Sequence, residues 1–315
     1  MRYADARPQR GAAVLIALVT VIVAVSIAAS VIGSLGRSID NASGRQDQAQ
    51  ARLLARGAAD WARNVLADDA KRTRVDHLRE PWTVQVPPTP VNSGPLDGDI
   101  SGEINDWSGL FNVNNLAPNG KPDETSRDEF ERLLRAIGVN AGKATQLAEN
   151  LQAWIASEES ENDGENSEKR RSGRSADASA PRSALADIDE LRQLSGFDDM
   201  LISQLTPYAV AVPAPSKINI NTASAEVLSA VITDLSLDEA RILVAERDRA
   251  WFKDIADFNA RLPKNAVPGS SERLDVMSRF FLVTGRASHG KAMVRMEVLL
   301  DRKNIWPDIL WQRIL

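Results

Sequence analysis

The sequence predicts an α+β protein in which one long N-terminal helix packs on a small antiparallel sheet, with a large helical domain inserted into that sheet. Three observations predict this fold. An uncharged apolar run occupies residues 12–36, segments with strand-like alternation lie near residues 98–106 and 280–300, and helical periodicity fills most of the chain between them. Because strands both precede and follow the helical stretch, the helices are expected to form an insertion into one sheet.

The N-terminal run is long enough to cross a membrane. No residue from Ala12 to Gly36 is charged, and a helix of that length spans the hydrocarbon core of a bilayer. Beyond Arg37, apolar side chains recur at the spacing of one helix face at Leu54, Ala58, Trp61 and Val65. These patterns predict one helix of about 50 residues that is apolar all round in its first half and amphipathic in its second.

The flanking charges predict the orientation of this helix. Arg2, Arg7 and Arg10 precede it against a single Asp5, so the short leader is expected in the cytoplasm and the head outside it. An ordinary cleaved signal peptide is the alternative. The apolar run is longer than a usual signal core and continues into the amphipathic pattern, which favours a single-pass membrane anchor.

Composition excludes several classes of function. The chain has 315 residues and a formal net charge of −5, which argues against binding nucleic acid by broad phosphate neutralisation. It has no Cys, which excludes disulfides and thiolate metal sites, and only two histidines, His77 and His289. No nucleophile with a plausible partner and no Gly-rich phosphate loop stands out, so an enzyme is not expected.

The leader resembles that of type IV pilin-like proteins. The segment Gln9-Arg10-Gly11-Ala12 joins a basic leader to the apolar helix through a glycine. The resemblance implies that a membrane prepilin peptidase cuts after Gly11 and methylates the new amine of Ala12. Most pilins carry a glutamate five residues into the mature chain, whereas this chain has Ile16 there.

Two segments of the head resemble the protein K family of type II secretion systems. They are ISGEINDWSGLFNVNNL at residues 100–116 and LADIDELRQLSGF at residues 185–197. The lack of the pilin glutamate is also typical of that family. The resemblance implies a minor pseudopilin at the tip of the pseudopilus, with a periplasmic head and an anchor in the bacterial inner membrane. Its implied partners are the minor pseudopilins I and J, and contact with secreted proteins is left open.

This reading divides the chain into five parts. Residues 1–11 form the cleaved leader, 12–36 the transmembrane helix, and 37–116 the amphipathic helix with the first part of a pilin-like head. Residues 117–277 form the inserted helical domain, with a polar loop near 157–181, and residues 278–315 add the C-terminal strands.

The insertion contains recognisable helix signals. Ser126 to Glu129 fits a capping box, and Gly138 is placed to end the helix that follows. Residues 217–255 resemble a helix-hairpin-helix unit, whose DNA-binding members have a Gly-rich turn. Here the turn, Thr233 to Ser236, has no glycine and includes an aspartate, so a packing module is favoured over a membrane-anchored DNA-uptake protein.

Calcium is the one ligand that the resemblance suggests. Relatives often carry an aspartate-rich D-W-I-D-x-D segment, but the matching residues 153–158 here read AWIASE, without either leading aspartate. The nearby acids could still supply the oxygen ligands that Ca²⁺ prefers, at Glu158, Glu161, Asp163 and Glu165. A solvated acidic loop is the favoured interpretation, and a calcium site is kept as the alternative.

Overall fold

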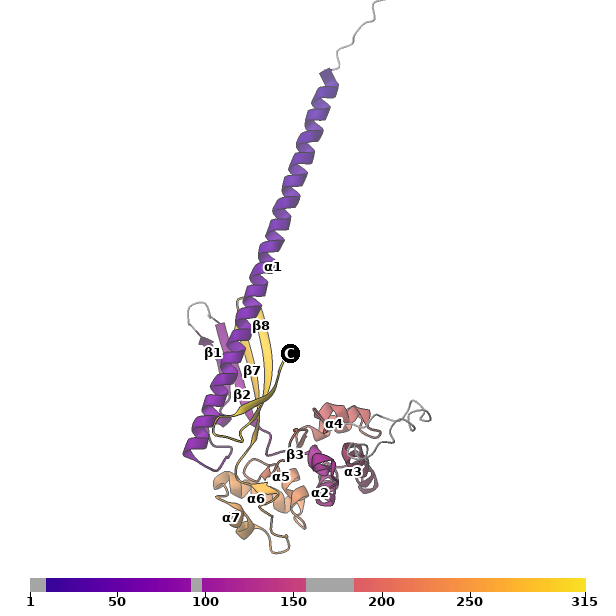
Figure 1. Cartoon of the computed structure of the whole chain (residues 1–315), viewed down its shortest axis with the longest axis vertical. Coiled ribbons are helices and arrows are strands. Elements are labelled where there is room, and N and C mark those ends of the chain that lie inside the picture. Colours follow the sequence, from indigo (N-terminus) through magenta and orange to yellow (C-terminus); the bar gives the residue numbers. More distant parts are fainter. Residues whose placement is uncertain (1–9, 92–97, 157–183) are drawn as a thin grey trace, which may run out of the picture.

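A single helix dominates the molecule (Figure 1). The computed structural model describes residues 10–91, 98–156 and 184–315. Helix α1 (Arg10–Arg72) runs unbroken for 63 residues and is longer than the sequence predicted. Gly44 and Gly57 lie within it without ending it, because a glycine in a helix costs only about 1 kcal/mol relative to alanine. The prediction of one continuous helix with two dissimilar halves is confirmed.

The sheet has five antiparallel strands in the order β1-β2-β7-β8-β9. The strands are β1 (Val86–Val91), β2 (Gly98–Asp106), β7 (Phe280–His289), β8 (Ala292–Asp301) and β9 (Asp308–Ile314). Gly290 lies in the tight turn between β7 and β8 with φ 55°, a conformation that favours glycine. The predicted α+β class, with a long helix on an antiparallel sheet, is confirmed.

The lower half of α1 packs on this sheet through small side chains. Its buried stripe includes Ala51, Leu54, Ala55, Ala62 and Leu66, which meet alternate residues of the strands such as Val283, Ala287, Met296 and Val298. Alanines allow the helix backbone to approach the sheet closely. The predicted face was shifted by about one residue: Leu54 is buried, but Trp61 lies at the edge of the contact with 51% of its surface exposed.

The insertion lies between β2 and β7 and has its own hydrophobic core. Its helices are α2 (Glu124–Ala136), α3 (Ala141–Ala156), α4 (Asp199–Leu205), α5 (Ala225–Val231), α6 (Leu237–Arg249) and α7 (Ile255–Arg261). Short parallel pairs tie it together: β3 (Phe111–Asn112) with β4 (Ala209–Val210), and β5 (Ile218–Asn219) with β6 (Leu274–Asp275). The last residues of the 100–116 motif, 113–116, form a 3₁₀ turn that leads out of β3.

The start of α2 differs from the prediction. Helix α2 begins at Glu124 and is capped by Asp123, which accepts a hydrogen bond from the Ser126 backbone N–H at 2.6 Å. The predicted capping box at Ser126 and Glu129 was therefore placed one turn too late. Both side chains are buried and contact Arg273 instead, so their polarity serves a long-range contact. Gly138 follows the end of α2 with φ 96°, as expected for a helix stop.

Candidate assembly surfaces and the domain junction

The upper half of α1 is an exposed apolar surface. From Val14 to Leu35 every large apolar side chain is at least half exposed, and this is the one stretch of the described chain that is long and apolar enough to cross a membrane. Several of its hydroxyl groups bond to the helix backbone: Thr20 Oγ1 donates to the Ile16 carbonyl at 3.0 Å, and Ser26 Oγ to that of Ile22 at 2.8 Å. Such internal hydrogen bonds lower the cost of placing these hydroxyl groups in hydrocarbon.

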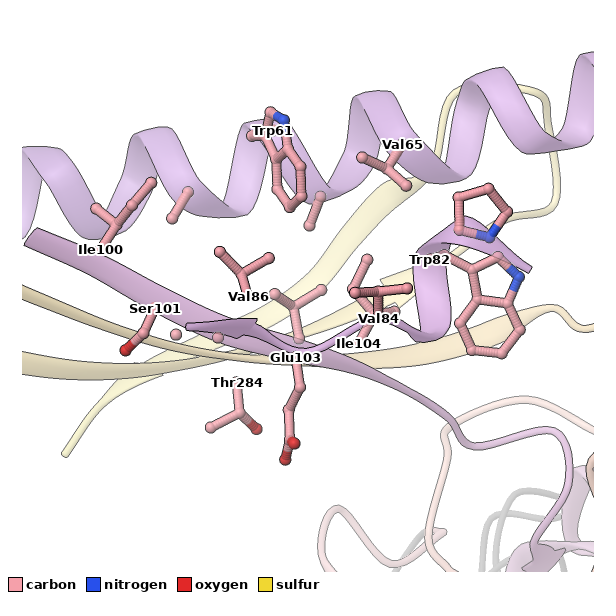
Figure 2. Close-up of a pocket in the computed structure, with 16 residues that line it drawn as sticks. Trp61, Val65, Trp82, Val84, Val86, Ile100, Ser101, Glu103, Ile104 and Thr284 are labelled. Atoms are coloured by element: carbon pink, nitrogen blue, oxygen red, sulfur yellow. The ribbon is translucent and has the colours of Figure 1, made fainter. Parts of the chain in front are cut away.

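A groove lies along one side of the contact between the lower half of α1 and the sheet (Figure 2). Its walls are mostly apolar, with Trp61 and Val65 from α1 and Val86 and Ile104 from the strands. Gly102 and Gly285 are opposite each other in the ladder between β2 and β7. A Cβ at Gly285 would meet only the Ser101 carbonyl oxygen, at 4.0 Å, so the absence of a side chain at Gly285 leaves the groove open at this point.

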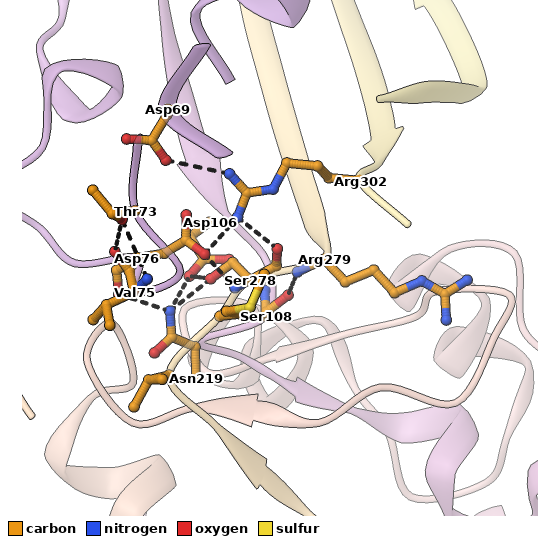
Figure 3. A network of polar contacts seen from close by, with 12 residues as sticks. Asp69, Thr73, Val75, Asp76, Asp106, Ser108, Asn219, Ser278, Arg279 and Arg302 are labelled. Carbon is orange, nitrogen blue, oxygen red and sulfur yellow. Dashed lines mark hydrogen bonds and ion pairs between the residues drawn. The ribbon is translucent and has the colours of Figure 1, made fainter. Parts of the chain in front are cut away.

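A buried ionic cluster lies where α1, the sheet and the insertion meet (Figure 3). Arg302, between β8 and β9, forms an ion pair with Asp76 and places Nη1 3.3 Å from Asp69. Glu80 accepts hydrogen bonds from the His77 backbone N–H and from Trp82 Nε1, both at 2.9 Å. All four charged residues of the cluster are less than 9% exposed.

The cluster continues into a set of further hydrogen bonds at the same place. Asp106, at the end of β2, accepts from the hydroxyls of Ser278 and Thr222. Asn219 of β5 donates to Ser278 Oγ at 2.7 Å and to the Asp76 carbonyl at 3.1 Å. The two crossings between sheet and insertion, near Asp106 and Ser278, are thereby held to the end of α1.

The cluster contains more acid than base, which shifts its protonation. Burial, followed by the nearby Glu80 and Asp76 carboxylates, raises the pKa of Asp69 to about 7. Burial likewise raises the pKa of Asp106 to about 6, although the hydroxyls of Ser278 and Thr222 oppose the shift. One guanidinium cannot neutralise three buried carboxylates, so a proton is retained near neutral pH.

The same carboxylates have the composition of a cation site. Oxygen atoms of Asp69, Asp76 and Glu80 lie within 4.8 Å of one another. The guanidinium of Arg302 already bonds two of them, and backbone and indole N–H groups bond the third. These contacts favour an internal ion pair over a metal site.

The asparagines of the motif at residues 111–116 organise the insertion. Asn114 Nδ2 donates to the carbonyls of Leu185 and Val212, both at 2.9 Å, and its oxygen accepts from the Leu185 N–H. Asn112 donates to the Ala214 carbonyl at 3.1 Å. The motif therefore joins chain segments about 70 to 100 residues apart, which explains its polar character in a buried place.

The hairpin between α5 and α6 is poorly suited to binding a phosphate. Asp234 in the turn has φ 60°, and Ser236 caps α6 in a reciprocal capping box with Glu239. The backbone N–H groups of Ser236 and Glu239 are thus bonded within the chain, beside the Glu239 carboxylate. This geometry agrees with the predicted packing role.

The residues that the sequence singled out are spread along the chain. Helix α1 begins at Arg10, so Gly11 and Ala12 lie in its first turn, and Ile16 is 66% exposed. The calcium candidates Glu158, Glu161, Asp163 and Glu165 lie outside the described residues. His77, one of the two histidines, is half-buried and stacks on Trp251 with ring centroids 4.0 Å apart.

The junction cluster was missed by the sequence analysis. Arg302 and its partners are more than 200 residues apart, so no spacing rule connects them. One signal was present: Asp69 follows Ala62 and Leu66 on the buried stripe of α1, and an acid on an apolar face indicates a buried partner.

Comparison with known proteins gives a consistent result. Two sequence models described as type II secretion system (T2SS), protein K match residues 109–214 and 218–277, together more than half of the chain. A protein named Type II secretion system protein K from Pseudomonas aeruginosa is 28% identical over 302 residues, covering 94% of this chain and 88% of the relative. Its namesake from Klebsiella pneumoniae is 27% identical, covering 94% and 93%.

A solved structure shares the fold. A chain of the GspK-GspI-GspJ complex from the enterotoxigenic Escherichia coli type 2 secretion system aligns with a TM-score of 0.69 at 24% identity. The alignment covers 87% of this chain and 99% of the other.

Proposed function

Because this chain belongs to the type II secretion system protein K family, whose members are minor pseudopilins, we propose that it is the tip subunit of the pseudopilus. In this role it acts by assembly and aids protein export, without bond chemistry of its own. The observation that carries the proposal is the division of α1 into two halves. Its first half is apolar and exposed, and its second half packs on the sheet.

The membrane half of α1 stores the subunit before assembly. The basic leader stays in the cytoplasm and the head lies in the periplasm, as the flanking arginines favour. Ile16 supports the tip position, because a carboxylate at this depth is costly unless a neighbour pairs with it. A subunit with isoleucine there needs no such neighbour above it.

The insertion supports the same position. It lies at the end of α1 that is far from the membrane segment (Figure 1). Bulk at that end would obstruct a further subunit stacked above, whereas the sides of α1 stay open to neighbours below. The minor pseudopilins I and J are the proposed neighbours, since the structural relative is part of a GspK-GspI-GspJ complex.

Processing by a prepilin peptidase tests the proposal. We expect co-expression with the peptidase to release residues 1–11 and leave a methylated Ala12, read by N-terminal sequencing and mass spectrometry. Gly11→Val should block the cut, whereas Gly36→Ala should not, because a Cβ at Gly36 would meet nothing within 4 Å. A mature chain trimmed within Val14 to Gly36 and free in solution would contradict the proposal.

A further inference from the structure

The two edges of the sheet differ in how they are protected. Strand β1 forms one edge and contains Pro87, Pro88 and Pro90, which cannot donate a backbone hydrogen bond. Strand β9 forms the other edge and has no proline within Asp308–Ile314. Exposed sheet edges are normally blocked by prolines, charges or covering segments, because they otherwise pair with further strands.

The outer side of β9 offers free backbone groups. Leu315 donates its N–H to the Arg295 carbonyl at 2.9 Å, and the ladder register pairs Ile314 with Met296 and Gln312 with Val298. In an antiparallel ladder, alternate residues direct both backbone groups to the partner strand, so Gln312 and Ile314 direct theirs away from β8. In the described part of the chain, no strand pairs with this side of β9.

The side chains around this edge are apolar and accessible. Ile309 is 41% exposed and Ile314 48%, and both pair with β8 residues that face α1. Trp306, just before the strand, is 42% exposed and lies under the guanidinium of Arg63 from α1. An unblocked backbone edge beside exposed isoleucines favours a strand with β-branched or aromatic side chains.

From these features we infer that β9 is a docking edge for an extended strand of a neighbouring, non-identical subunit, which would add a sixth strand to the sheet. The inference rests on the proposed role in an assembly and specifies which surface binds the neighbour. The backbone of Gln312 and Ile314 would supply the hydrogen bonds, and the isoleucines would pack against the added strand.

A second copy of this chain fits the edge poorly. Antiparallel pairing of two β9 strands would reverse one copy relative to the other, so their membrane helices would point in opposite directions and could not share one anchoring orientation (Figure 1). Pairing of β9 with β1 of another copy would meet the three prolines. The geometry therefore favours a different polypeptide that has an unblocked edge of its own.

Amide hydrogen exchange on the assembled complex tests this inference. The full-length chain is combined in detergent with full-length minor pseudopilins I and J, and exchange is compared with that of the chain alone. We expect the amides of Gln312 and Ile314 to exchange at least about tenfold more slowly in the complex. The amide of Arg313, which faces β8 in the free chain, is an internal control and should change little.

A matched pair of variants adds a binding readout. Gln312→Pro removes one outward N–H and should raise the dissociation constant for the partner subunits about tenfold. Gln312→Thr keeps the N–H and should bind as the wild type does. Unchanged exchange at Gln312 and Ile314 in a complex that does form, or a homodimer that protects these amides, would overturn this inference. Failure of the wild-type chain to bind I and J at all would overturn the proposed function as well.

Discussion

The inserted domain and the helix-sheet head bury their apolar residues to different extents. The insertion encloses a core of large side chains, including the fully buried Phe130, Leu133, Leu134 and Phe258. The head leaves much of its apolar surface open, on α1, in the groove beside Trp61 and along β9. This contrast indicates that the insertion buries its apolar side chains by itself. The head leaves apolar surface that neighbouring subunits could cover.

The largest expected effect would come from breaking the junction that joins the two regions. Arg302→Ala leaves Asp69 and Asp76 buried without their guanidinium and should lower the free energy of unfolding by about 3–5 kcal/mol. Chemical denaturation would measure this loss of stability. Arg241→Ala removes an exposed pair with Asp238 and should cost less than about 1 kcal/mol. Similar losses in the two variants would show that the junction is not an important ionic contact.

A cavity in the insertion tests whether the two cores are independent. Leu134→Ala, at a fully buried site in α2, should destabilise the insertion by about 3 kcal/mol. Hydrogen exchange should then rise in α2 and α5 and stay unchanged in β7 and β8. Met200→Ala is a matched control, because Met200 is 73% exposed. Equal loosening of the sheet by Leu134→Ala would mean that the two cores unfold as one unit.

The acid-rich junction should make stability depend on pH. A carboxyl whose pKa is higher in the folded chain than in the unfolded chain binds a proton preferentially in the folded state. Stability therefore falls as pH rises between the two values. With the pKa of Asp69 at about 7 and that of Asp106 at about 6, the combined loss from pH 5 to pH 7 should be on the order of 3–4 kcal/mol.

Denaturation at a series of pH values would measure this slope, and Asp69→Asn should reduce it. A free energy of unfolding that rises over the same interval would contradict the assigned protonation of the junction.

The smallest expected effect concerns the open groove of the head. A side chain at Gly285 would meet no heavy atom nearer than the Ser101 carbonyl oxygen at 4.0 Å, so Gly285→Val should fill the groove and stabilise the chain by about 1 kcal/mol. At the facing Gly102, a Cβ would lie 2.6 Å from the Thr284 oxygen, and Gly102→Ala should destabilise it. Thermal unfolding would compare the two variants, and changes in melting temperature of the same sign would contradict this description of the groove.

Local patterns predicted the elements of this fold better than their contacts. The apolar run, the alternation at residues 280–300 and the stop at Gly138 each depend on neighbours in sequence, and the structure agrees with all three. The start of α2 was misplaced because Ser126 and Glu129 imitate a local cap, whereas they bond Arg273 from a distant segment.

The exposed surfaces and the buried ionic cluster were harder to predict, because they too depend on residues that are distant in sequence. Trp61 has the spacing of a buried residue, but the buried stripe of α1 runs through Ala55, Ala62 and Leu66 and leaves Trp61 exposed. The contact of Arg302 with Asp69 and Asp76 exists only once the chain has folded. The unprotected edge at β9 required the strand order, because no local pattern states which strand is outermost.

The way the insertion joins the sheet has a consequence for how such subunits could have diversified. Asp106 and Phe281 are neighbours in the ladder between β2 and β7, although the whole helical domain separates them in sequence. A turn of a few residues could close the same hairpin. An ancestor with a plain five-stranded head could therefore have acquired the domain at one loop, and later changes in its size would leave the strand order intact.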